Sequence, residues 1–153
     1  MDLTSKVRQL LEVALENYPE LFLIDLKVGS DNSIRVVLDG DHGVSLQDCI
    51  NVSRAVEHQL DREEEDFSLE VASVGVGTPL QNARQFIKNI GRKLKVEVLG
   101  NPPIQGTLIA ADQKVFTVTW KQREPKPVGK GKITVEKKET LSYENIANAK
   151  VII

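Results

Sequence analysis

The chain of 153 residues is poor in cysteine, in aromatic side chains and in long apolar runs. Its single cysteine, Cys49, excludes an intramolecular disulfide and is typical of a protein in a reducing compartment. Aromatic residues make up 5% of the chain, so stacking of bases on rings is not expected to dominate any nucleic-acid contact. No apolar run approaches the roughly 18 residues of a membrane span, and the N-terminus lacks a signal-peptide pattern. We therefore expect a cytoplasmic protein.

The charged residues are divided near Pro79 and Leu80. Residues 1–80 contain 6 Lys and Arg against 16 Asp and Glu, a net charge of −10. Residues 81–153 contain 14 against 6, a net charge of +8, and the overall charge of −2 hides this division. A basic half attracts phosphate, whereas an acidic half repels it. The division indicates two oppositely charged surfaces and a binding protein with an oriented partner.

The first half has the apolar patterns of a small α/β sandwich. The expected elements are a helix from Leu3 that ends before Pro19, strands at Leu21–Gly29 and Ser33–Leu38, a helix from Ser45 to Leu60, and a strand at Phe67–Ala72. Asp2 or Thr4 can cap the first helix, and Ser45 with Asp48 resembles a capping box at the second. This order favours a three-stranded sheet with both helices on one face.

The same patterns predict which side chains face the core of this half. The first strand is expected to turn one set to a common face: Phe22, Ile24, Leu26 and Val28. The second helix is expected to bury one stripe: Leu46, Cys49, Ile50, Ser53, Val56 and Leu60.

The second half is typical of a short helix followed by a small β-barrel. The helix is capped by Asn82 and extends to about Ile90, carrying Phe86. The strand-like runs are Leu94–Leu99, Thr107–Ala111, Val115–Trp120, Ile133–Glu136, Glu139–Leu141 and Lys150–Ile153. We interpret Trp120 as a barrel residue rather than a base-stacking platform.

Basic residues of the second half are the candidate phosphate-binding set. The segment Lys121–Lys132 has two prolines, two glycines and no apolar periodicity, so we expect a mobile basic loop. Together with the start of the first barrel strand it supplies Arg92, Lys93, Lys95, Lys121, Arg123, Lys126, Lys130 and Lys132. Lys137 and Lys138 are expected at a strand edge, where lysine also protects against edge-to-edge aggregation.

Residues suited to catalysis or metal binding are few. Asp39, Asp41 and His42 share a turn, which favours turn formation over a metal site because these residue types are good turn formers. Cys49 with His42 or His58 could act as nucleophile and base, but its place on an apolar stripe favours a core residue. We therefore expect no enzymatic activity, no metal and no cofactor.

Two further segments can be interpreted either as ordinary structural features or as binding sites. Gly75 and Gly77 lack the Lys–Ser/Thr ending of a P-loop and the third glycine of a dinucleotide fingerprint, which favours a permissive linker. The acidic run Asp61–Asp66 is either a solvated helix end or a surface for a basic protein.

The segment at the charge boundary, LEVASVGVGTPL at Leu69–Leu80, resembles the interdomain signature of the ribosome maturation factor RimP family, approximately LEVSSPGxDRPL. The matching residues there are Leu69, Glu70, Val71, Ser73, Gly75, Pro79 and Leu80. Other parts resemble the family in the same order: Gly43–Cys49 with Ser53 and Arg54, then Phe86, Gly91, Gly106 with Leu108, and Ile146–Ala149.

The resemblance implies an N-terminal α/β domain over 1–73, a linker over 74–82 and a C-terminal Sm-like, SH3-type barrel over 83–153. It also implies a non-catalytic assembly factor that binds the immature small (30S) ribosomal subunit. Its partners would be rRNA and small-subunit ribosomal proteins, including the protein conventionally numbered twelve. The alternative is a generic Sm-like RNA-binding module with a dimerisation or regulatory domain. We expect a monomer with no membrane or small-molecule partner.

The chain departs from this family pattern at its interdomain hinge. The hinge residues are Val74, Gly75, Gly77, Thr78 and Pro79. Val74 replaces the usual Pro, and Gly77 with Thr78 replaces the usual Asp–Arg pair. Losing a proline and gaining a glycine loosens the backbone, so we expect a more variable domain orientation than in members with the full motif.

Overall fold

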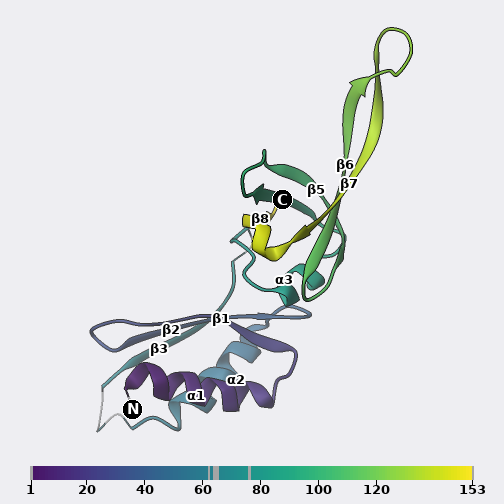
Figure 1. The fold of residues 1–153 in the computed structure, drawn as a ribbon. Coiled ribbons are helices and arrows are strands. Elements are labelled where there is room, and N and C mark those ends of the chain that lie inside the picture. The colour runs from purple at the N-terminus through teal and green to yellow at the C-terminus, as the bar shows by residue number, and fades with distance from the viewer. Residues whose placement is uncertain (1, 62, 64–65, 76, 153) are drawn as a thin grey trace. The chain divides into compact units, whose positions relative to one another are not determined.

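The structure is a computed structural model that describes residues 2–61, 63, 66–75 and 77–152. The chain divides into two compact units, Met1–Gly75 (unit 1) and Val76–Ile153 (unit 2). Figure 1 shows the elements of each unit along the chain. The fold class is α+β, because unit 1 combines helices with a mixed sheet and unit 2 is dominated by an antiparallel sheet.

Unit 1 has the predicted order of helix, strand, strand, helix and strand. Its elements are α1 (Leu3–Glu16), β1 (Leu21–Val28), β2 (Ser33–Gly40), α2 (Leu46–Glu57) and β3 (Ser68–Ser73). The sheet order is β1-β2-β3, with β1 antiparallel and β3 parallel to the central strand β2. Both helices lie on one face of this sheet, as predicted (Figure 1).

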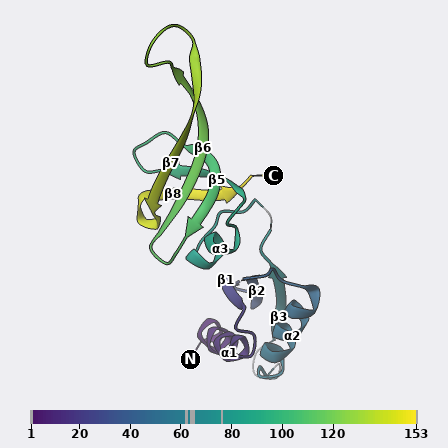
Figure 2. The same ribbon diagram turned by 90° about the vertical axis from the view of Figure 1, so that its right-hand side faces the viewer.

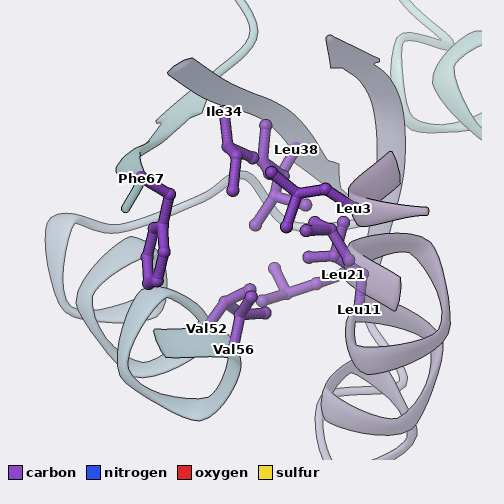
Figure 3. Packing of buried hydrophobic residues seen from close by; sticks show 10 residues of the cluster. Leu3, Leu11, Leu21, Ile34, Leu38, Val52, Val56 and Phe67 are labelled. Atoms are coloured by element: carbon purple, nitrogen blue, oxygen red, sulfur yellow. The ribbon is translucent and has the colours of Figure 1, made fainter. Parts of the chain in front are cut away.

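The core of unit 1 lies between the two helices and the sheet (Figure 3). Alternating residues of β2 point into it, because side chains of a strand alternate between its two faces. These are Ile34, Val36 and Leu38, each at most 2% exposed. The helices contribute one turn-spaced stripe each, Val7 with Leu11 and Val52 with Val56.

The predicted common face of β1 was wrong in the first half of the strand. The pairing of β1 with β2 shifts between Leu23 and Asp25, which marks a β-bulge. A bulge inserts one residue and reverses the alternation of side chains beyond it. The β1 residues in contact with the core are Leu21, Leu23, Leu26 and Val28. Phe22 and Ile24 therefore do not share a face with the last two.

The predicted stripe of α2 was correct only in part. Its buried residues are Cys49, Val52 and Val56, whereas Ile50 and Ser53 are half-buried. Leu46 is 78% exposed because it stands in the first turn, ahead of the stripe that faces the sheet. The helix ends at Glu57 rather than at Leu60, which nevertheless packs against the core from the following turn.

Helix starts agree with their predicted caps. Asp2 Oδ1 accepts the Ser5 backbone N–H at 2.8 Å. Ser45 Oγ accepts the Asp48 N–H at 3.0 Å, and Asp48 Oδ2 accepts the Ser45 N–H at 2.9 Å. This reciprocal pair satisfies two backbone donors that the helix leaves unpaired, so Asp serves here in the place usually taken by Glu or Gln.

Unit 2 consists of a short helix and one five-stranded antiparallel sheet. Its elements are α3 (Ala83–Lys88), β4 (Lys93–Val98), β5 (Ile104–Ala111), β6 (Val115–Pro125), β7 (Lys132–Ser142), a 3₁₀ turn (Tyr143–Asn145) and β8 (Ile146–Val151). The strand order is β7-β6-β5-β4-β8, and no pairing between β7 and β8 is found in the described part of the chain. The two runs predicted on either side of Lys137 are one strand, and the last strand begins before its predicted start.

Aromatic rings fill the centre of unit 2. Phe86 of α3 lies 4.8 Å from Phe116 of β6 and 4.8 Å from Tyr143, between ring centroids. Such aromatic pairs add attraction beyond the apolar area that they bury. Around them are Leu94, Val96, Leu108, Val118, Leu141 and Ala149. Ile90, which was predicted on the same helix as Phe86, lies beyond the end of α3 and is 44% exposed.

A close strand approach explains one glycine of β5. A Cβ atom on Gly106 would lie 2.6 Å from the carbonyl oxygen of Thr119 in β6, closer than real side chains come to backbone. Only glycine allows β5 and β6 to approach at this point.

Candidate nucleic-acid interface

Half of the basic segment 121–132 is strand, so the prediction of a loop throughout was wrong. β6 continues to Pro125 and β7 begins at Lys132, and these two residues pair. Only residues 126–131 form the turn, in which the Lys126 N–H donates to the Gly131 carbonyl at 3.1 Å. Figures 1 and 2 show this hairpin extending past the rest of its sheet. We call residues 119–138 the hairpin arm.

The strand register gives the arm two faces of different composition. Side chains of paired residues share a face, and the face changes at each step along the strand. One face, called the cationic face, contains Thr119, Lys121, Arg123, Pro125, Lys132, Thr134, Glu136 and Lys138. The other, called the ladder face, contains Trp120, Gln122, Glu124, Ile133, Val135 and Lys137. The ladder face continues the buried side of β6 that carries Phe116 and Val118.

A chain of polar contacts runs along the ladder face. Trp120 Nε1 donates to Gln122 Oε1 at 3.2 Å, and Gln122 Nε2 donates to Glu124 Oε1 at 3.3 Å. Lys137 Nζ lies 2.7 Å from the same Glu124 oxygen, with both side chains about one-third exposed. The contacts link every second residue of β6 and join Glu124 to Lys137 of β7, so they stabilise the arm from one side.

Cations on the opposite face have no such partners. Lys121, Arg123, Lys132 and Lys138 are all exposed, and none makes a hydrogen bond or ion pair through its side chain with any residue that the structure describes. Glu136 is the one acid of the cationic face, so the face carries a net charge of +3. Unpaired surface cations of this kind are suited to contacts with phosphate.

The basic residues of β4 lie on the same side of the sheet as the cationic face. Lys93 pairs with Thr107 of β5, Thr107 pairs with Thr119 of β6, and Thr119 pairs with Lys138 of β7. Lys95 shares the outward face of β4 with Lys93, since Leu94 and Val96 between and after them are buried. The outward side of the sheet therefore carries cations on β4, β6 and β7, whereas β5 between β4 and β6 contributes none.

Eight predicted cations thus divide into three groups. Five lie on the outward side of the sheet: Lys93, Lys95, Lys121, Arg123 and Lys132. Arg92 precedes β4, and the turn of the arm contains Lys126 and Lys130. Two more cations lie on that outward side: Lys138, which was predicted at a strand edge but not included in the phosphate-binding set, and Lys150 of β8, which pairs with Lys95 and was not considered. Side chains alternate between the two faces along each strand, so the face of Lys138 can be deduced once the residue that pairs with it is known. The sequence alone does not give this pairing.

The residues considered for chemistry all lie in the described part of the chain. No group of three or more His, Cys, Asp or Glu is placed there to hold a metal ion. Asp39 is buried in β2 and its Oδ1 accepts the Gly40 N–H at 2.8 Å. Burial, and secondarily the charge of Asp48, raises the pKa of the Cys49 thiol, which favours the unreactive protonated form. His58 is exposed at the end of α2.

The predicted hinge is anchored at both sides. The Val74 N–H donates to the Leu38 carbonyl of β2 at 2.9 Å, which continues the pairing of β3. On the other side, the Leu80 N–H donates to the Ala149 carbonyl of β8 at 2.7 Å. The hinge residues between these anchors, Gly75, Gly77, Thr78 and Pro79, are exposed. Gly77 has a φ of +82°, a conformation that favours glycine.

The acidic run between α2 and β3 is described only in part, because residues 62, 64 and 65 lie outside the described residues. Asp61 and Asp66 are exposed, and Asp61 Oδ1 accepts the Glu63 N–H at 2.8 Å. Among the helices that the structure describes, none is long and apolar enough to cross a membrane.

An α+β protein with a cationic surface on the sheet of its second unit is the class that these observations define. Residues 9–77 match the family model described as the RimP N-terminal domain. The chain is 55% identical over 151 residues to the ribosome maturation factor RimP of Christiangramia forsetii, covering 99% of this chain and 98% of that one. It is 51% identical to that of Flavobacterium psychrophilum, covering 100% and 99%. The match to that of Porphyromonas gingivalis is 38% over 59% of each chain. The chain belongs to the RimP family.

Proposed function

We propose that the protein is a ribosome maturation factor that binds the immature small (30S) ribosomal subunit in the cytoplasm and catalyses no reaction. The observation that carries this function is the identity of 55% and 51% with two ribosome maturation factors over nearly their full lengths. Support for a binding role comes from the cations on the outward side of the sheet of unit 2, of which Lys93, Lys121, Arg123, Lys132 and Lys138 are exposed.

The two halves of the chain would meet different parts of the particle. The cations on the outward side of the sheet, with Arg92 and the turn residues Lys126 and Lys130, suit rRNA phosphates. The net charge of −10 over residues 1–80 suits a basic ribosomal protein, such as the small-subunit protein numbered twelve. Binding energy from these contacts would order a local region of the subunit without bond chemistry.

The architecture that we propose for this role has an N-terminal domain over 1–73, a linker over 74–82 and a C-terminal Sm-like, SH3-type barrel over 83–153. The barrel is supported by five antiparallel strands in one sheet, by an aromatic core and by the close approach of β5 and β6 at Gly106. Limited proteolysis is expected to cut the chain first between Gly75 and Pro79, and a first cut within 1–73 or within 83–153 would contradict this division.

Co-sedimentation in sucrose gradients tests the function. The intact chain should sediment with immature small subunits and much less with mature ones. If about four phosphates are neutralised, the logarithm of the association constant should fall with the logarithm of salt concentration at a slope of about −3 to −4. Tight binding to naked rRNA with no preference for the particle would favour the alternative, a generic Sm-like RNA-binding module. Light scattering should show a monomer.

A further inference from the structure

We propose that the hairpin arm is a preformed, one-sided RNA-binding element: its cationic face contacts the phosphates of one rRNA segment, and its ladder face keeps the two strands together. The inference rests on the proposed function and deepens it, because it assigns RNA contact to Lys121, Arg123, Lys132 and Lys138 and excludes Lys137. It also replaces a mobile basic loop with a structured ribbon.

Two neighbouring lysines of β7 differ in whether they form an ion pair within the arm. Lys137 and Lys138 are adjacent in the sequence and point to opposite faces of β7. Lys137 forms an ion pair with Glu124 at 2.7 Å and is about one-third exposed. Lys138 is exposed, and no described residue neutralises it. The arm therefore uses the charge of one lysine internally and leaves the charge of the other for a partner.

The cations are spaced along the whole length of the arm. From the pair Thr119 with Lys138 to the pair Pro125 with Lys132 the arm extends over six residue steps, about 20 Å at 3.4 Å per residue. Lys121 and Arg123 lie about 7 Å apart along β6, because residues two apart on a strand share a face. A row of cations along 20 Å suits a polymer whose charges repeat at regular intervals, as those of a nucleic-acid backbone do.

The composition of the cationic face favours RNA over a protein partner. Besides its charges, this face presents the hydroxyl groups of Thr119 and Thr134, and Pro125 is its only apolar side chain. Threonine hydroxyls donate to phosphate oxygens, as Lys and Arg side chains do. Protein interfaces instead depend on buried aromatic or large apolar anchors at their centre. The large apolar residues of the arm strands, such as Ile133 and Val135, lie on the ladder face.

Strand pairing gives the arm an energetic advantage over a loop. Ordering a mobile side chain or segment on binding costs free energy, and a preformed surface avoids much of this cost. A two-stranded hairpin alone is only marginally stable in water. In this arm, the Trp120–Gln122–Glu124 chain and the Lys137 ion pair add contacts along the ladder face. The ladder face thus explains how the cations keep their positions before RNA binds.

The test compares full-length variants on protein-free small-subunit rRNA, with binding measured over a series of salt concentrations. The variant K121Q/R123Q/K132Q/K138Q should lower the magnitude of the salt slope by about 3, which is four contacts at roughly 0.7–0.9 each. The variant E124Q/K137Q, altered on the ladder face, should keep the slope of the unaltered chain. Trp120 fluorescence during urea unfolding checks that the variants fold.

A charge-conserving variant, K121R/R123K/K132R/K138R, should also keep the slope, which separates loss of charge from damage to the arm. An unchanged slope in the glutamine variant would overturn the inference, as would an equal loss in E124Q/K137Q. Loss of particle binding by the glutamine variant with an unchanged slope on rRNA would assign the face to a protein and overturn it too. Failure of the intact chain to sediment with immature subunits would instead contradict the proposed function.

Discussion

The two units of the chain cover their sheets in different ways. In unit 1 two helices of 14 and 12 residues cover one face of a three-stranded sheet. Unit 2 has a single α-helix of 6 residues in its described part, and its own strands surround most of an aromatic core. Where helices supply the cover, the strands stay at 8 residues or fewer, whereas β6 and β7 reach 11 residues each. The long strands of unit 2 thus serve both the core and a charged surface.

Removing one large core residue from each unit should cause the largest loss of stability and should show whether the two units unfold independently. Phe116→Ala is expected to lower the free energy of unfolding of unit 2 by about 3–5 kcal/mol, because it leaves a cavity under the aromatic cluster. Leu11→Ala should cost unit 1 about 2–5 kcal/mol. Trp120 is the only tryptophan, so its fluorescence in urea reports unit 2, while far-UV circular dichroism reports both units.

In that experiment the Trp120 transition should shift to lower urea in Phe116→Ala and stay in place in Leu11→Ala. Equal shifts of the Trp120 transition in both variants would show that the two units unfold as one and would contradict their division.

The next effect tests the close approach of β5 and β6 in unit 2. Gly106→Ala should lower the stability of unit 2 by about 1–3 kcal/mol, because the added methyl group would press on the Thr119 carbonyl. The neighbouring exposed residue supplies the control, since Gln105→Ala should change stability by no more than about 0.5 kcal/mol. Urea unfolding followed by Trp120 fluorescence measures both. Equal stability of the two variants would rule out the steric role of the glycine.

A smaller effect compares the capping boxes of the two units. Ser45→Ala removes the cap of α2, and Asn82→Ala removes the side-chain acceptor of the Gln85 N–H at the start of α3. Each change should cost about 1 kcal/mol. The first should shift only the circular dichroism transition of unit 1, and the second should also shift the Trp120 transition. Unchanged transitions in both variants would mean that water replaces the caps at no cost.

The smallest effect is a pH dependence confined to unit 2. Burial, and secondarily the Asp112 carboxylate, raises the pKa of Tyr143 to about 12. Its neutral hydroxyl donates to the Asp112 carbonyl at 2.7 Å. Because the folded pKa is raised, the stabilisation is present below the ordinary pKa near 10 and is lost as pH rises through about 12. The stability difference between the unaltered chain and Tyr143→Phe should therefore shrink over this range. A constant difference would contradict the assignment.

Local signals allowed much of unit 1 to be predicted. Caps such as Ser45 with Asp48, and the helical spacing of Val7 and Leu11, depend on residues three or four positions apart, so they can be read from one segment. The bulge near Ile24 could not be predicted in this way, because it arises from the register between two strands and leaves no local composition signal.

The charge of the candidate site was predictable, but its division into two faces was not. Lysine, glutamate and proline are depleted in strands, so the segment after Trp120 has the composition of a loop. It becomes a strand because each residue from Lys121 to Pro125 has a partner in β7, a tertiary effect that overrides local preference. The residues of the cationic face are set by this register, so the sequence alone could place Lys138 at a strand edge but could not show which cations share its face.

The hydrogen bond from Leu80 to Ala149 has a consequence for the order in which the two units fold during translation. It joins two residues at opposite ends of unit 2, and β8 pairs with β4 only once the last residues of the chain are available. Unit 1 ends at Gly75, so it can fold while the rest of the polypeptide is still being translated. At typical elongation rates, the remaining 78 residues take about 4–16 s. During that interval the acidic unit is complete and the basic unit is not.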